Sequence, residues 1–160
     1  MNINVQRFSL SEYILDFNSQ KSMLRCLDAY DEDVIWIKKL ADISFISAVS
    51  ENDDKFFLSC QIDELSGKFA AIYKENGSTA WFIPGRDFLN VIYGRNLFLI
   101  FIDEREVYYF IKIELNTGQR IWHHIIQKDL ENYTINYNEI ILQYKSGRVE
   151  RLNPATGRPI

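Results

Sequence analysis

Short runs of apolar, β-branched and aromatic residues follow one another along most of the chain, with polar turn residues between them. In Val107–Glu114 the odd-numbered positions are apolar and share one face, while Lys112 and Glu114 lie on the other. Leu97–Ile102 is apolar on both faces, which is typical of a central, covered strand. Because turn signals such as Asn76-Gly77 separate the runs, the pattern predicts an antiparallel all-β fold.

The N-terminal stretch has a different pattern. Ser9 and Glu12 have the spacing of a helix capping box. Apolar residues then follow at i, i+3, i+4 and i+7, from Leu10 to Phe17. We therefore expect a short helix from about residue 10 to residue 18, with a strand as the alternative.

A repeat is marked by three tryptophans, namely Trp36, Trp81 and Trp122. They are separated by 45 and 41 residues. Gly77 and Gly118 each precede a tryptophan by four residues, and Gly157 continues the period. The first copy, Asp31–Trp36, keeps a polar turn and the tryptophan but has no glycine. A period of this length is typical of blade or solenoid repeats.

One of these copies resembles a known family. Ile113–Trp122, with the sequence Ile-Glu-Leu-Asn-Thr-Gly-Gln-Arg-Ile-Trp, is similar to the blade signature of quinoprotein-like (PQQ-type) β-propellers. Leu152–Arg158 resembles the same turn, and Ile72–Gly77 is a weaker copy. The resemblance covers residues 30–160. It implies about three four-stranded blades, with each Gly-to-Trp segment as the fourth strand.

A closed propeller needs about four blades or more. We therefore expect a partial propeller, without the axial cofactor site of the family and with no cofactor. At 160 residues the chain is expected to form a single domain, 1–160. Residues 1–30 would hold the helix and the first strand, and residues 31–160 the blade-like repeats.

Charge and composition limit the partners. With 18 basic and 22 acidic side chains the net charge is −4, which argues against a nucleic-acid binder and permits a basic protein partner. Cys26 and Cys60 are expected to be buried, reduced thiols. Met1–Arg7 lacks the apolar core of a secretory signal, and no stretch is long enough for a membrane span. We expect a cytoplasmic protein that binds no membrane.

Catalytic chemistry has little support in the sequence. His123 and His124 are neighbours on a predicted strand, so their side chains should point to opposite faces and cannot share one metal ion. We find no nucleophile elbow, phosphate loop, Cys-x-x-Cys pair or His-Glu-x-x-His helix. The chain is therefore expected not to be an enzyme and to have no metal site.

The acidic residues are unevenly distributed. In a simple meander, alternate turns share one end of the fold, so the turns at 31–33 and 51–54 should lie at the same end. Together they provide six candidate partner-binding residues: Asp31, Glu32, Asp33, Glu51, Asp53 and Asp54. Such a field speeds encounter with a basic partner. The alternative is that these are ordinary solvated turns.

Three functions remain open at this stage. The first is a non-catalytic inhibitor that binds a basic protein, because small size, acidic charge and abundant aromatics resemble the profile of bacterial toxin-immunity proteins, which often oppose nucleases. The second is a scaffold module that oligomerises to pair its open edges. The third is a small-molecule binder that uses a pocket between blades. The oligomeric state is not predicted.

Overall fold

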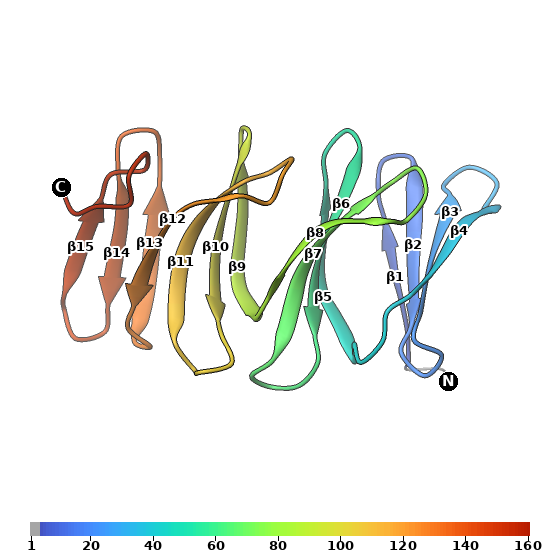
Figure 1. The fold of residues 1–160 in the computed structure, drawn as a ribbon, viewed down its shortest axis with the longest axis horizontal. Coiled ribbons are helices and arrows are strands. Elements are labelled where there is room, and N and C mark those ends of the chain that lie inside the picture. Colours follow the sequence, from blue (N-terminus) through green and yellow to red (C-terminus); the bar gives the residue numbers. More distant parts are fainter. Residues whose placement is uncertain (1–3) are drawn as a thin grey trace. The chain divides into compact units, whose positions relative to one another are not determined.

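The computed structural model describes residues 4–160, and every regular element in that range is a β-strand (Figure 1). The first sheet has the order β1-β2-β3-β4 and the second β5-β6-β7-β8. The third has the order β12-β11-β10-β9, and the fourth contains only β13-β14-β15. The bounds are β1 Val5–Ser9, β2 Tyr13–Asn18, β3 Met23–Asp28, β4 Val34–Lys39, β5 Phe45–Glu51, β6 Lys55–Gln61, β7 Gly67–Tyr73, β8 Thr79–Pro84, β9 Arg86–Tyr93, β10 Asn96–Ile102, β11 Tyr108–Glu114, β12 Arg120–Ile126, β13 Leu130–Ile135, β14 Ile140–Tyr144 and β15 Val149–Leu152.

The chain divides into two compact units, one ending at Arg86 and the other beginning at Asp87. The N-terminal unit contains the first two sheets, and the C-terminal unit contains the other two. All of the strand pairs within the sheets are antiparallel hairpin neighbours, as in a meander.

The antiparallel all-β class and the blade-like sheets are confirmed. The structure has four sheets where the sequence predicted about three, because the segment upstream of Trp36 forms a complete four-stranded sheet. The Gly-to-Trp segments are indeed fourth strands, since Trp81 lies in β8 and Trp122 in β12.

The predicted helix at residues 10–18 is wrong. Residues 10–12 form a turn, in which the Leu10 amide donates to the Tyr13 carbonyl at 2.9 Å, and β2 follows. Leu15 and Phe17 are buried on the core face of β2, whereas Asp16 lies on the opposite face. Tyr13, Leu15 and Phe17 thus fit a period of two, and the tertiary core selects the strand over the helical period.

Each tryptophan follows an irregularity that the sequence did not reveal. The pairing of the fourth strand with the third shifts by one residue just before Trp36, Trp81 and Trp122. A bulge of this kind bends an edge strand and re-aims the side chain that follows it. The repeat therefore includes a bulge in the backbone before each tryptophan as well as the tryptophan itself.

The three turns that lead into these tryptophans and the turn around Gly157 share one pattern of backbone hydrogen bonds. In the first, the Glu32 amide donates to the Asp28 carbonyl and the Asp28 amide to the Asp33 carbonyl, both at 2.9 Å. The same two bonds recur around Gly77, Gly118 and Gly157. Glu32 has φ 60°, close to the 77°, 73° and 69° of these glycines, so it occupies the glycine position of the first copy.

Two of the tryptophans dock on the turn of the following sheet in the same unit. Trp36 Nε1 donates to the Lys74 carbonyl at 2.7 Å, and Trp122 Nε1 to the Pro154 carbonyl at 2.9 Å. A Cβ on Gly77 would lie 2.6 Å from the Trp36 ring, and one on Gly157 would lie 2.5 Å from the Trp122 ring. These turns therefore need glycine both for the positive φ and for the close ring.

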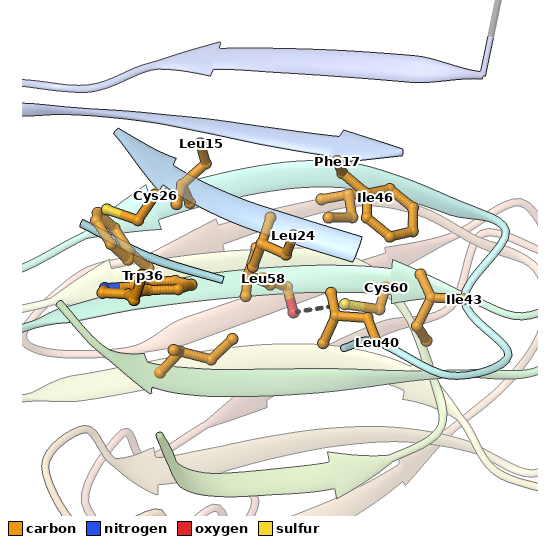
Figure 2. Packing of buried hydrophobic residues seen from close by; sticks show 12 residues of the cluster. Leu15, Phe17, Leu24, Cys26, Trp36, Leu40, Ile43, Ile46, Leu58 and Cys60 are labelled. Atoms are coloured by element: carbon orange, nitrogen blue, oxygen red, sulfur yellow. Dashed lines mark hydrogen bonds between the residues drawn. The ribbon is translucent and has the colours of Figure 1, made fainter. Parts of the chain in front are cut away.

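The core of the N-terminal unit lies between its two sheets. Figure 2 shows Leu15, Phe17 and Leu24 of the first sheet facing Leu58 and Cys60 of the second. Cys26 and Cys60 are both buried and unbonded to one another, as predicted. In the C-terminal unit, a second cluster joins Phe98, Phe110 and Trp122 to Leu142 and Leu152.

Candidate protein-binding surface

Four turns of the N-terminal unit lie at one end of its sheets (Figure 1). They connect β1 to β2, β3 to β4, β5 to β6 and β7 to β8. Hydrogen bonds join them in series. The Ser11 amide donates to Glu51 Oε1 at 3.0 Å, the Ala29 amide to the Glu12 carbonyl at 3.0 Å, and the Lys74 amide to the Asp54 carbonyl at 2.9 Å. The acidic turns predicted to share an end are thus held together through the turn between β1 and β2.

We call this surface the acidic end. It consists of Glu12, Tyr30, Asp31, Glu32, Asp33, Glu51, Asp53, Asp54 and Glu75. All six acids predicted from the sequence belong to it. Two basic residues near it, Lys55 and Lys74, are buried beneath the turns and do not project from the surface.

Three of the six predicted acids form ion pairs. Glu51 contacts Lys74 at 2.8 Å and Asp54 contacts Lys55 at 3.0 Å, while Glu32 pairs with Arg7. The Glu51 carboxylate is only 21% exposed, so its first role is to neutralise the buried ammonium of Lys74. Glu51 is therefore a supporting residue of the acidic end and not a contact surface.

The other three predicted acids are available to a partner. Asp31, Asp33 and Asp53 are exposed and form no ion pair with any residue in the range 4–160. Asp31 Oδ1 accepts a hydrogen bond from the Asp33 amide at 2.9 Å, which fixes the turn and leaves the carboxylate in solvent. Their charge is not cancelled locally, so it adds to the field outside the protein.

An exposed aromatic side chain, Tyr30, lies on the same turn as Asp31 and Asp33. Tyr30 is 98% exposed and lies directly before Asp31, at the tip of the turn between β3 and β4. Its amide donates to Asp28 Oδ1 at 2.8 Å, which holds the backbone of the turn. Exposed tyrosines in polar surroundings are frequent anchors of protein interfaces. Tyr30 is not among the six candidate residues predicted from the sequence, although its position beside three acids is a usable signal.

The pKa of Glu51 reflects its position. Burial alone would raise this pKa, but hydrogen bonds from Lys74 and Ser11, together with the Lys74 charge, outweigh burial and lower it below the ordinary 4.5. The carboxylate is therefore held in its charged form by the fold.

The outer face of the first sheet, opposite the second sheet, carries a charged row beside apolar residues such as Ile14 and Ile37. Arg7, Asp16 and Arg25 form a cross-strand row on β1, β2 and β3. Arg25 donates to both carboxylate oxygens of Asp16, at 2.9 and 2.6 Å. The equivalent face of the second sheet instead carries Phe56 and Leu58 in the core.

Other candidate chemistry is sparse. His123 and His124 point to opposite faces, as predicted: His123 is exposed, and His124 Nε2 lies 2.7 Å from Glu150 Oε2. Residues 4–160 contain no group of three or more His, Cys, Asp or Glu side chains placed to hold a metal ion. They also contain no helix of the length and apolarity needed to cross a membrane.

No family model and no curated protein matches the sequence. Solved structures do match the fold. The computationally designed propeller Ika8 superimposes with a TM-score of 0.66 at 12% identity, over 97% of this chain and 47% of Ika8. The designed Ika4 gives 0.63 at 11% identity, over 92% of this chain and 88% of Ika4.

Natural propellers match as well. The quinohemoprotein alcohol dehydrogenase from Comamonas testosteroni gives a TM-score of 0.62 at 10% identity, over 97% of this chain and 34% of the dehydrogenase. This chain thus spans about half of Ika8 and a third of the dehydrogenase. At these identities the similarity concerns the fold alone. It confirms the propeller-like blade resemblance.

Proposed function

We propose that this chain is a non-catalytic, protein-binding inhibitor that docks a basic protein through the acidic end. The observation that carries the proposal is the exposed Tyr30 on the same turn as Asp31 and Asp33, with Asp53 on another turn at the same end. None of these three carboxylates forms an ion pair within residues 4–160. An aromatic anchor inside a field of one sign combines contact area with long-range attraction.

The negative charge of the acidic end favours a partner with a basic surface. A protein with a basic active cleft, such as a secreted bacterial nuclease toxin, offers the complementary surface. We propose that the chain acts in the cytoplasm as an immunity protein that covers such a cleft. Its net charge of −4 and the absence of a catalytic motif in its sequence support an inhibitor over an enzyme.

The acidic end is tested by charge reversal. In the double variant Asp31→Lys/Asp53→Lys, both substituted carboxylates are exposed and neither forms an ion pair within residues 4–160. We expect the association rate with the partner to fall by about tenfold or more at low salt, and the difference to shrink as salt is added. The single variant Glu104→Lys, at an exposed turn of the C-terminal unit, is the control for nonspecific charge effects. Equal rates for the double variant and the control would exclude the acidic end as the dock.

A second candidate is a scaffold module that acts by self-association. The three-stranded fourth sheet favours it, since within residues 4–160 the outer side of β15 is joined only by the bridge between Leu152 and Pro159. The charged row Arg7–Asp16–Arg25 weighs against stacking on the first sheet, because packing a sheet there would desolvate three charges. Light scattering coupled to size-exclusion chromatography separates the candidates. A dimer or ring that persists on dilution supports the scaffold, and a monomer at high concentration excludes it.

A further inference from the structure

Each unit contains a junction between two adjacent sheets, and the two junctions are built alike at one end. There, Trp36 docks on the turn at Lys74, and Trp122 docks on the turn at Pro154. At the other end, the chain crosses from one sheet to the next through residues 40–44 in the N-terminal unit and residues 127–129 in the C-terminal unit. The two crossings can therefore be compared directly.

The crossing in the N-terminal unit is filled. Leu40 and Ile43 are both buried in the core, and Figure 2 shows them beside Cys60. The Gln6 side chain closes the gap between β1 and β5, since it donates to the Ile46 carbonyl at 2.8 Å and accepts from the Ile46 amide at 2.9 Å.

The crossing in the C-terminal unit is open. It is two residues shorter and entirely polar, with the sequence Gln127-Lys128-Asp129. No buried aliphatic pair corresponds to Leu40 and Ile43, and a cavity of about 330 Å³ remains. Its size lies at the lower limit of small-molecule sites in proteins.

The lining of this cavity has a defined chemistry. Phe88 and Tyr108 are stacked at one side, with ring centroids 5.8 Å apart and planes 24° apart. Ile126 adds apolar surface, and Lys128 and Glu131 are lining residues of opposite charge. A flat ring can extend the aromatic pair, and an ammonium and a carboxylate can pair with Glu131 and Lys128.

We propose that this cavity binds a small aromatic amino acid, with the ring beside Phe88 and Tyr108 and the two charged groups toward Lys128 and Glu131. The site lies wholly within the C-terminal unit, so this inference does not rest on the acidic end.

The test is a titration followed by the methyl NMR signals of Ile100, Ile126 and Leu130, all of which line the cavity. L-phenylalanine is expected to shift these signals saturably, whereas L-alanine, which lacks the ring, should not. N-acetyl-L-phenylalanine amide, which carries the ring without the charges, should bind about tenfold more weakly than L-phenylalanine. Equal binding of this amide would overturn the amino-acid assignment and identify an aromatic side chain of a protein as the occupant.

Two variants test whether the shifts of the methyl NMR signals arise from binding in the cavity. Gln127→Ile places an aliphatic side chain in the open crossing and is expected to weaken L-phenylalanine binding by about tenfold without lowering the melting temperature. Glu131→Gln, which keeps the volume and removes the charge, should weaken L-phenylalanine and leave the neutral amide unchanged. Absence of any saturable shift in the folded wild-type protein, or binding unaffected by both variants, would overturn the site.

Discussion

At the scale of single residues, the most informative position is the left-handed one in the repeated turn. Gly77 and Gly157 hold it against a tryptophan ring, and Glu32 holds it in the first copy with φ 60°. The first copy therefore keeps the backbone conformation of the turn without a glycine, and the Glu32 side chain pairs with Arg7.

Replacement of glycine separates the two requirements of this position. Gly77→Ala is expected to lower the free energy of unfolding by about 2–4 kcal/mol, because the positive φ and the Trp36 ring both oppose a Cβ. Gly94→Ala is the matched control, with φ 63° and no atom within 4 Å of the added Cβ, and should cost about 1 kcal/mol. Denaturant unfolding measures both. Equal losses would show that the ring contact adds nothing.

The buried thiols give a second prediction at this scale. Burial raises the pKa of Cys26 to about 11, so the thiol stays protonated and unreactive near neutral pH. Ellman's reagent should react slowly with the native protein and rapidly with both cysteines after unfolding in guanidinium chloride. Rapid reaction of Cys26 in the native protein would contradict its burial.

Glu51 gives a pH dependence. Since folding lowers its pKa, Glu51 contributes stability above the ordinary value of 4.5 and loses that contribution as the pH falls through the lowered folded value. Wild type should therefore lose more stability than Glu51→Gln on acidification below 4.5. Chemical denaturation at a series of pH values measures this difference, and parallel curves for the two proteins would contradict it.

At the scale of elements, the sequence predicted the fourth strands well and the first sheet poorly. Trp81 and Trp122 follow a turn glycine and mark β8 and β12 with little ambiguity. In β2, the residues Tyr13 and Phe17 satisfy both a helical and a strand period, and only the packing against the second sheet decides between them. Local patterns cannot distinguish two periods that share the same residues over so short a segment.

The docking of a fourth strand on the next sheet can be measured through the indole. Trp36→Phe keeps an aromatic ring but leaves the Lys74 carbonyl without its 2.7 Å donor. The expected loss in the free energy of unfolding is about 1–3 kcal/mol. Trp122→Phe removes the matching bond to Pro154 and should cost less, because Lys112 Nζ still donates to the Pro154 carbonyl at 3.0 Å. A loss below about 0.5 kcal/mol in both would show that the docking bonds are not needed.

At the scale of the whole molecule, the two units differ in the kind of binding surface that each contains. The N-terminal unit has the acidic end and a charged outer face, and the C-terminal unit has a cavity with aromatic lining. The six candidate acids were predicted from turn spacing alone. The pairing of Glu32 with Arg7 and of Glu51 with Lys74 required three-dimensional contacts, because these partners are distant in the sequence. Asp54 and Lys55 are sequence neighbours, and the position of Tyr30 beside three acids is likewise visible in the sequence.

The acidic end is the surface that we propose to dock a basic protein. The most direct measurement is a pull-down from the source cell with wild type, Asp31→Lys/Asp53→Lys and Glu104→Lys, washed at low and then high salt, with bound proteins identified by mass spectrometry. We expect one stoichiometric basic protein on wild type and on Glu104→Lys, with binding weakened by salt and lost from the double variant. A partner retained equally by all three proteins, or no partner on wild type, would contradict it.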